Sequence, residues 1–472
     1  MKSPDRSSPS WQTPLYQQYW KIKDEVPGTL LFFRLGDFYE LFGDDAVQAA
    51  PLLQVQLTSR SQSAEPIPMC GIPYHAWENY ADKILSSGLS IAIADQIEAA
   101  GAKKLVDRAV VRILTPGLPI DPTKLNSKSY HYLAVISQTD TYEIVLFDFL
   151  ARKFFQGEFS DDAALSEILS RTDPREILLS SEVAIEGLPS LSRYEKKTLN
   201  WGRGSASSIL KDYLAYTQRW TTSEVEAYLP ELQSLQEFSS NNEEVLLSSQ
   251  VREQWDIHPH LENLLDECGS AGGSRQLREI LSRPLLKVER IQARQELLKY
   301  IPVKNFLELT RELYDLERLV GRILVRASKP YELLRVRDSL KVLRKIDDFF
   351  KGEWSAYFYA LKDFEKLPDW KALSPELLAM ENLFSKTLAE EATVQSSVRD
   401  LICEGIDKDF DSLKNLYSNL EEWLTTFEEK LKAETGINNL KLRFNRVAGF
   451  YIEVSKAQSA KFQVTLSADK LL

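Results

Sequence analysis

Residues 13–57 read TPLYQQYWKIKDEVPGTLLFFRLGDFYELFGDDAVQAAPLLQVQL. This stretch predicts a helix, then a strand, a turn and a second helix. Thr13 is typical of a helix N-cap and Pro14 of a first helical position, so we expect the first helix over residues 13–25. Helical and extended patterns that alternate at such short range favour a small α/β domain.

Further signals extend this α/β domain over residues 13–122. The strands that we expect are Thr29–Arg34, Ser90–Asp95 and Ala109–Leu114. The turn Gly36-Asp37 and a helix through Phe38–Leu53 follow the first of these strands.

A second α/β domain is predicted over residues 126–240, and helices after it. Its elements are expected to be strands at Tyr132–Ser137, Glu143–Phe149, Lys153–Glu158 and Glu176–Ser180 and a helix at residues 161–170. Residues 243–435 carry Leu, Glu, Lys and Arg at helical spacing, which predicts an all-α domain. Residues 436–472 begin with a strand-like alternation, and the polar residues 1–12 are expected to form a disordered arm.

The last predicted helix, over residues 404–433, carries a heptad seam. Two series of apolar residues spaced by seven supply the seam: Phe410, Tyr417, Leu424 and Leu431, and Leu413, Leu420 and Phe427. Such a seam needs a second helix against it, and no later helical pattern follows in the sequence. We therefore expect an architecture that is cut short, with the seam partly uncovered.

Composition excludes several classes of protein. The 472 residues are 43% hydrophobic and 27% charged, with 19 glycines and 20 prolines, which excludes a collagen-like or wholly disordered chain. Three distant cysteines (Cys70, Cys268 and Cys403) and four histidines predict neither a disulfide framework nor a metal site. Free thiols suit a reducing compartment, and the apolar runs are shorter than the roughly 20 residues of a membrane span. We expect a cytoplasmic protein with no membrane partner.

The charge is unevenly distributed. The whole chain has a net charge of −11, yet residues 430–472 contain eight Lys or Arg and only three Asp or Glu. A local basic excess is a better sign of nucleic-acid contact than the total charge. The end of the sequence is therefore a candidate for contact with a nucleic-acid backbone.

Three short stretches carry a family resemblance. They are Gly36-Asp37-Phe38-Tyr39-Glu40, PIPMCGIPYHAW at residues 66–77 and VRILTPG at residues 111–117. Together they closely resemble the N-terminal mismatch-recognition domain of the bacterial MutS family of DNA mismatch-repair proteins. Weaker similarity continues through DPREI at residues 173–177, GSRQLR at residues 273–278, DLER at residues 315–318 and residues 440–454.

The resemblance implies a fold and a function. The expected domains are mismatch recognition, a ribonuclease-H-like connector, a helical core or lever, and the start of a β clamp. The implied function is recognition of mismatched or unpaired bases in double-stranded DNA. Phe38 would be the wedge that enters from the minor groove, and Glu40 would contact the unstacked base.

Candidate contacts to the DNA backbone are Arg60, His75, Arg112, Lys441, Arg443, Lys456 and Lys461. Lys441 and Arg443 alternate on one face of a predicted strand, which is typical of backbone contact but also of a solvated edge strand. Lys456 and Lys461 extend this basic pattern. The alternative for Arg60 and Arg112 is an ordinary surface charge and, for His75, a hydrogen-bonded loop position. Arg318, Arg322 and Arg326 are predicted to pair with Glu317 and other acids, and Asp148 is not predicted to serve a nuclease site.

Members of the family carry ATP and magnesium at a C-terminal domain with a G-x-x-x-x-G-K-[ST] loop. No such string occurs in these 472 residues, so we expect no ATPase activity and no cofactor in this chain. Two alternatives to DNA recognition stay open. One is an interaction or regulatory protein that binds full-length MutS or the mismatch-repair matchmaker protein, and the other is a non-functional truncated gene product.

Overall fold

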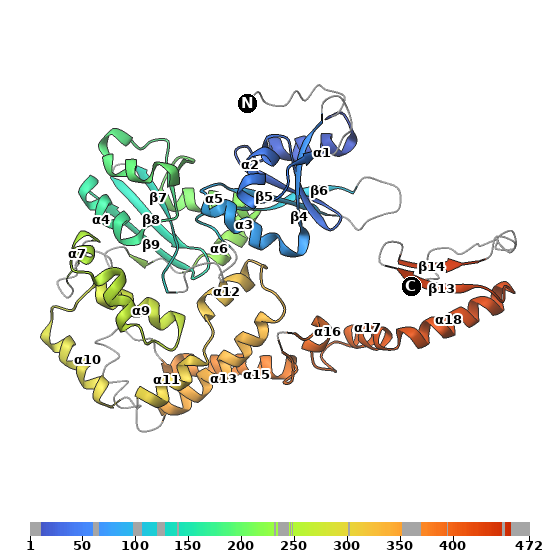
Figure 1. Cartoon of the computed structure of the whole chain (residues 1–472). Helices are drawn as coiled ribbons and strands as arrows, with labels where there is room; N and C mark the ends of the chain where they lie inside the picture. Colours follow the sequence, from blue (N-terminus) through green and yellow to red (C-terminus); the bar gives the residue numbers. More distant parts are fainter. Residues whose placement is uncertain are drawn as a thin grey trace. The chain divides into compact units, whose positions relative to one another are not determined.

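The computed structural model describes residues 11–59, 66–97, 106–119, 128–138, 141–230, 233–234, 245, 247, 249–300, 303–351, 370–393, 395–445 and 449–454. The chain divides into two compact units, Met1–Ala379 and Met380–Leu472. The first unit holds two mixed sheets followed by helices (Figure 1). The predicted fold class is confirmed at this level, as an α/β N-terminal region followed by a helical core.

The first sheet has six strands in the order β3-β4-β2-β1-β5-β6. Its elements are α1 (Pro14–Asp24), β1 (Leu30–Leu35), β2 (Phe38–Phe42), α2 (Asp44–Leu53), β3 (Thr58–Ser59), β4 (Pro68–Pro73), the short 3-10 turn η2 (Tyr74–Ala76), α3 (Trp77–Ser86), β5 (Ile91–Gln96) and β6 (Arg108–Leu114). β1 and β5 are parallel, and the other neighbouring strands are antiparallel. Apolar side chains of α1 cover one face of the sheet, and those of α2 and α3 cover the other.

One prediction in this domain was wrong, because residues 38–53 do not form a single helix. Phe38–Phe42 form β2, which pairs with both β1 and β4, and α2 begins only at Asp44. Tyr39 and Leu41 are buried on the face that packs against α2 and α3. Burial at a spacing of two is the pattern of a strand, so pairing with two neighbours prevails over the helical spacing that the sequence suggests.

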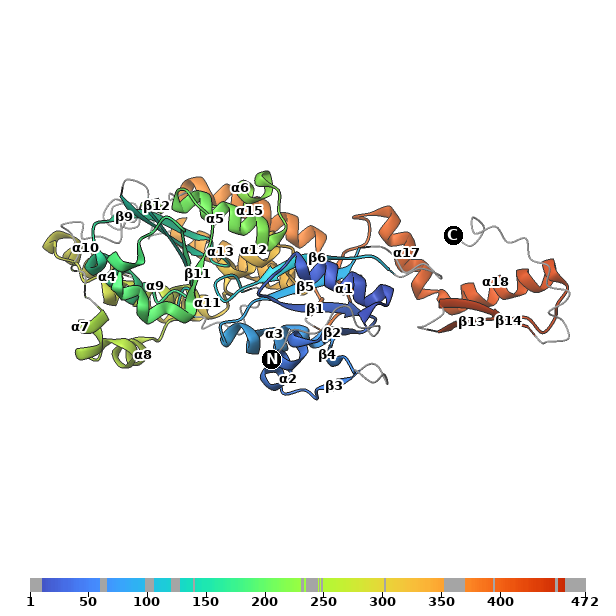
Figure 2. The same ribbon diagram turned by 90° about the horizontal axis from the view of Figure 1, so that it is seen from above.

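The second sheet has the order β11-β10-β7-β8-β9-β12. Its elements are β7 (Tyr132–Gln138), β8 (Tyr142–Asp148), β9 (Lys153–Phe159), α4 (Asp162–Thr172), β10 (Glu176–Leu179), the 3-10 turns η4 (Ile185–Gly187) and η5 (Pro189–Lys197), β11 (Thr198–Asn200), α5 (Ala206–Gln218), α6 (Thr222–Tyr228) and β12 (Gln233–Ser234). The apolar clusters place α4 on one face and α5 on the other (Figure 2). The four strands and the helix predicted here are confirmed.

A buried carboxylate joins the two sheets. Glu176 on β10 accepts hydrogen bonds from the hydroxyl of Thr115 (2.6 Å), the amide of Gly117 (3.0 Å) and the hydroxyl of Tyr213 (2.6 Å). A Cβ atom at Gly117 would lie only 2.8 Å from an oxygen of Glu176, so this close approach requires glycine. The Thr-Pro-Gly turn that ends the first domain is thereby fastened to the second.

The described residues that follow β12 in the first unit are mainly helical. Its elements are α7 (Ser249–Gln254), the π-helical turn η7 (Ile257–Leu261), α8 (Glu262–Leu265), α9 (Ala271–Ser282), α10 (Val288–Tyr300), α11 (Val303–Arg311), α12 (Leu316–Leu324) and α13 (Glu332–Lys351). α15 (Trp370–Thr387) runs across the boundary between the units. In the described parts of the chain, no helix is both long and apolar enough to cross a membrane.

The described residues of the second unit form helices and a hairpin. Its elements are α16 (Val398–Leu401), α17 (Lys408–Ser418), α18 (Leu420–Thr435), β13 (Lys441–Asn445) and β14 (Gly449–Glu453). The single helix predicted over residues 404–433 is therefore two helices that meet at Asn419. The seam is open in α17, where Leu413 is 65% and Tyr417 56% exposed, and closed at Leu431, which packs against residues 437–440.

Candidate nucleic-acid interface

Phe38 is an exposed aromatic side chain at the start of β2. It lies opposite Leu35 on β1 and Pro73 on β4, directly after the Gly36-Asp37 turn, and its side chain is 49% exposed. The other aromatic residues of the same strands, Phe32, Phe33, Tyr39 and Phe42, are almost fully buried. An exposed ring on a paired strand leaves a flat apolar surface that is available to a ligand.

The turn that precedes Phe38 is held in place on both sides. Gly36 has a φ of +59°, in the left-handed region that favours glycine. The amide of Tyr74 donates to the carbonyl of Asp37 (2.8 Å), and the guanidinium of Arg34 donates to the carbonyl of Gly36. These contacts fix the backbone from which the Phe38 ring projects.

Arg34 and Tyr74 are contributors that the sequence alone did not reveal. The guanidinium carbon of Arg34 lies 3.1 Å from the centre of the Tyr74 ring, an arrangement typical of a cation–π contact. The one available signal was a charged residue inside the otherwise apolar run of residues 30–35. That signal does not identify the partner, because Tyr74 follows a different strand and is distant in the sequence.

Glu40 follows on the same face of β2 as Phe38, because successive side chains of a strand alternate. It is half-buried and lies opposite Phe33 on β1 and Gly71 on β4. Farther along this face, Phe42 meets the rings of Tyr16 and Tyr19 of α1 edge-on, at 5.2 and 5.1 Å. Helix α1 thus covers the strand at Phe42. Towards the start of the strand, the same face presents the ring of Phe38 and the carboxylate of Glu40.

The remaining candidates of the first domain divide into three cases. His75 is exposed in the η2 turn, one residue after Tyr74. Arg112 is half-buried on β6 and donates to the carbonyl of Val325, and burial lowers the pKa of its guanidinium. Arg112 therefore joins β6 to the end of α12, and its guanidinium already has a partner inside the protein. Arg60 lies outside the described residues.

In the second unit, Lys441 and Arg443 are exposed on β13, and Leu442 between them is half-buried. The amide of Leu442 donates to Glu428 of α18 (3.0 Å), which holds the strand against that helix. Arg443 also forms an exposed ion pair with Glu453 of β14 (3.1 Å), which the sequence did not indicate. Such pairs are weak in water, so the pair leaves Arg443 able to exchange partners. Lys456 and Lys461 lie outside the described residues.

The arginines of α12 were predicted to be structural, and this is confirmed for Arg318 and Arg322, which are buried. Arg318 donates to the carbonyl of Ser129 (2.7 Å), and Arg322 donates to Glu332 (3.2 Å). Glu317 meets Arg275 of α9 at 2.5 Å. Pairing with an acid is confirmed for Arg318, whose guanidinium lies 3.8 Å from Asp315, and for Arg322.

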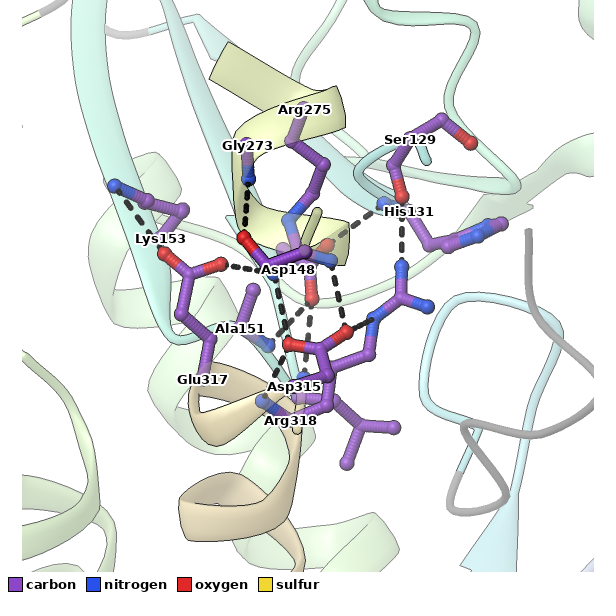
Figure 3. A network of polar contacts seen from close by, with 12 residues as sticks. Ser129, His131, Asp148, Ala151, Lys153, Gly273, Arg275, Asp315, Glu317 and Arg318 are labelled. Atoms are coloured by element: carbon purple, nitrogen blue, oxygen red, sulfur yellow. Dashed lines mark hydrogen bonds and ion pairs between the residues drawn. The ribbon is translucent and has the colours of Figure 1, made fainter. Parts of the chain in front are cut away.

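The same polar network surrounds Asp148 at the end of β8 (Figure 3). Its carboxylate accepts hydrogen bonds from the amides of His131 (2.7 Å), Leu150 (3.1 Å) and Ala151 (2.8 Å), while burial raises its pKa. Within the described residues, no group of three or more His, Cys, Asp or Glu is placed to hold a metal ion. Asp148 therefore organises the loop after its strand.

Two family models match this chain. The model of MutS domain I matches residues 13–122, and the model of MutS domain III matches residues 232–458. A relative from Staphylococcus saprophyticus, described as DNA mismatch repair protein MutS, is 30% identical over 486 residues. This chain belongs to the MutS family.

The alignment with the staphylococcal MutS covers 96% of this chain and 53% of the relative, so the chain spans about half the length of that protein. Phe38 and Glu40 lie within the match to MutS domain I. Lys441 and Arg443 lie within the match to MutS domain III. Both candidate sites, the Phe38–Glu40 pair and the basic pair on β13, therefore lie in segments that match MutS domains.

Proposed function

We propose that this chain recognises mismatched or unpaired bases in double-stranded DNA by inserting Phe38 from the minor groove. The observation that carries the proposal is an exposed phenylalanine on a braced turn in MutS domain I. Mismatched DNA differs from paired DNA chiefly in how readily it unstacks and bends. A wedge that must unstack a base step, at a cost of a few kcal/mol, therefore enters a mismatch more easily.

Glu40 adds selectivity in this proposal. It lies two residues from Phe38 on the same strand face, so its carboxylate reaches the base step that the ring opens. An unstacked base exposes donors that a carboxylate accepts, whereas the phosphates of fully paired DNA repel the negative charge. Glu40 would therefore disfavour paired DNA more than it favours the mismatch.

The test is equilibrium binding of the chain to a G·T duplex and to the matched paired duplex. Phe38→Ala is expected to weaken binding to the G·T duplex by about 1–3 kcal/mol, the scale of one lost base stack, and to leave paired binding nearly unchanged. Glu40→Ala is expected to reduce discrimination more than affinity. Ile185→Ala, which removes an equally exposed apolar side chain from the second domain, is the matched control. Equal losses on both duplexes for Phe38→Ala would refute the wedge.

The basic strand provides a contrasting arm of the same experiment. Lys441→Ala together with Arg443→Ala is expected to weaken binding to both duplexes equally, because phosphate contacts carry no sequence information. The salt dependence of binding should flatten by about one unit for each of the two positive charges that this variant lacks. If this variant no longer distinguished the G·T duplex from the paired duplex, mismatch recognition would belong to the basic strand and the wedge proposal would be contradicted.

We further propose that these 472 residues do not hydrolyse ATP by themselves. The sequence contains no G-x-x-x-x-G-K-[ST] loop to cradle phosphates. Phosphate release by the purified chain is expected to stay at the background of a heat-denatured sample. Release that co-purifies with the chain through two successive separations would contradict this.

A second candidate function is docking to mismatch-repair partners such as full-length MutS or the matchmaker protein. The exposed Leu413 and Tyr417 on α17 favour it, because an apolar heptad seam normally lies against another helix. In the binding experiment, no affinity for either duplex, together with binding to a full-length MutS, would favour docking over DNA recognition.

A further inference from the structure

A cavity of about 350 Å³ lies where the second sheet domain meets the helical core. Its walls come from the last turn of α4, from residues 128–132, and from α7, α8 and α9. Figures 1 and 2 both show α7 and α9 beside the end of α4. The volume falls within the range of pockets that hold small ligands.

The lining of this cavity is strongly basic. Seven lysine or arginine residues line it, against three acidic ones. Part of the positive charge is balanced inside the protein. Arg275 pairs with Asp315 (2.8 Å) and Glu317 (2.5 Å), and Arg278 pairs with Glu262 (3.5 Å).

Three arginines from three different elements converge on this cavity. Arg171 lies in the last turn of α4, Arg252 in α7, and Arg283 caps the end of α9. The pKa of Arg171 is lowered to about 10, first by burial and then by the positive charges of Arg283 and Arg252, although the carboxylates of Glu167 and Glu279 act in the opposite direction. The charges of Arg252 and Arg283 thus still act on Arg171 in this partly buried space, and a bound anion lowers that repulsion.

We propose that this arginine pocket, defined by Arg171, Arg252 and Arg283, binds a small phosphorylated anion such as the phosphate groups of a free nucleotide. Guanidinium groups present paired N–H donors that match phosphate oxygens, and all three arginines line the cavity. Arg171 belongs to the second sheet domain and the other two to the helical core. A bound anion therefore fastens these two parts together.

The test is calorimetric titration of the full chain with pyrophosphate and, separately, with ATP. One saturable site is expected. Arg171→Gln with Arg283→Gln should weaken it at least tenfold. Arg193→Gln with Arg311→Gln, which removes two exposed arginines outside the pocket, should leave it unchanged. No saturable binding by the original chain, or equal binding by the pocket variant, would overturn the proposal.

Two further arms keep the result interpretable. Arg171→Lys with Arg283→Lys retains both charges but loses the paired donors, so binding intermediate between the original and the Gln variant is expected, with unchanged thermal unfolding. If the folded lysine variant bound as weakly as the Gln variant, the result would still show that the anion binds to these guanidinium groups.

A second arm uses DNA as a competitor. A paired duplex at matched phosphate concentration should not displace pyrophosphate. Displacement would assign the pocket to the DNA backbone and overturn the small-anion proposal. None of these outcomes depends on the wedge function of Phe38.

Discussion

Phe38 and Phe42 stand at the two ends of one short strand, on the same face, and have opposite surroundings. Phe42 is 1% exposed and packs against the tyrosines of α1, whereas Phe38, at the other end of the strand, is 49% exposed. Residue type, strand and face are the same, so none of them explains the difference. The position of α1 over the strand decides which phenylalanine is core and which is surface.

This difference teaches how a functional aromatic can be distinguished from a structural one. A phenylalanine in a strand is normally held by burial, and Phe42 follows that rule. Phe38 is held instead by the backbone of the preceding turn, which Arg34 and Tyr74 brace. The wedge proposal therefore predicts that Phe42 contributes to the stability of the domain and Phe38 to DNA recognition. Single-residue variants test this difference.

The largest effect is expected at the buried end of the strand. Phe42→Ala removes a ring that packs against Tyr16 and Tyr19, and should lower the free energy of unfolding of the first domain by about 3–5 kcal/mol. Hydrogen exchange of the β1 and β2 amides measures this loss. A loss below about 1 kcal/mol would mean that α1 does not cover the strand as described.

A smaller effect is expected at the turn. Gly36→Ala should cost about 1–2 kcal/mol, because its φ of +59° is unfavourable for a residue with a Cβ. No atom lies within 4 Å of the position that this Cβ would occupy, so the cost comes from the backbone alone. Gly71→Ala on the neighbouring strand β4 is the matched control, because it meets only ordinary contacts at 3.6 Å and should cost less. Equal costs at both positions would remove the argument for a specialised turn.

The smallest effect on stability is expected at Phe38 itself. Phe38→Ala should change the free energy of unfolding by no more than about 0.5 kcal/mol, as is usual for an exposed side chain. The same exchange measurement as for Phe42→Ala provides the comparison. If Phe38→Ala destabilised the domain as strongly as Phe42→Ala, the exposed ring would be a structural residue and the comparison would collapse.

The success of sequence-based prediction varied with the strength of the local pattern. Strands β7, β8 and β9 were predicted closely, because long apolar runs between turn signals have few alternatives. β2 was predicted as the start of a helix, and β4 was not predicted, since proline at both of its ends argues against a strand. Both strands exist because they pair with each other, and pairing between distant segments leaves little local signal.

The sequence by itself determined the α/β and helical regions, the turn before Phe38 and the family resemblance, because these depend on local spacing and on short motifs. Only the tertiary structure decided that Phe38 is exposed and Phe42 buried, and that Arg34 stacks on Tyr74. It also decided that Arg112 contacts the end of α12 and that Arg171 meets Arg252 and Arg283 across a cavity. The physical reason is that burial and charge pairing depend on which distant segments pack together, whereas local sequence specifies only how each segment folds.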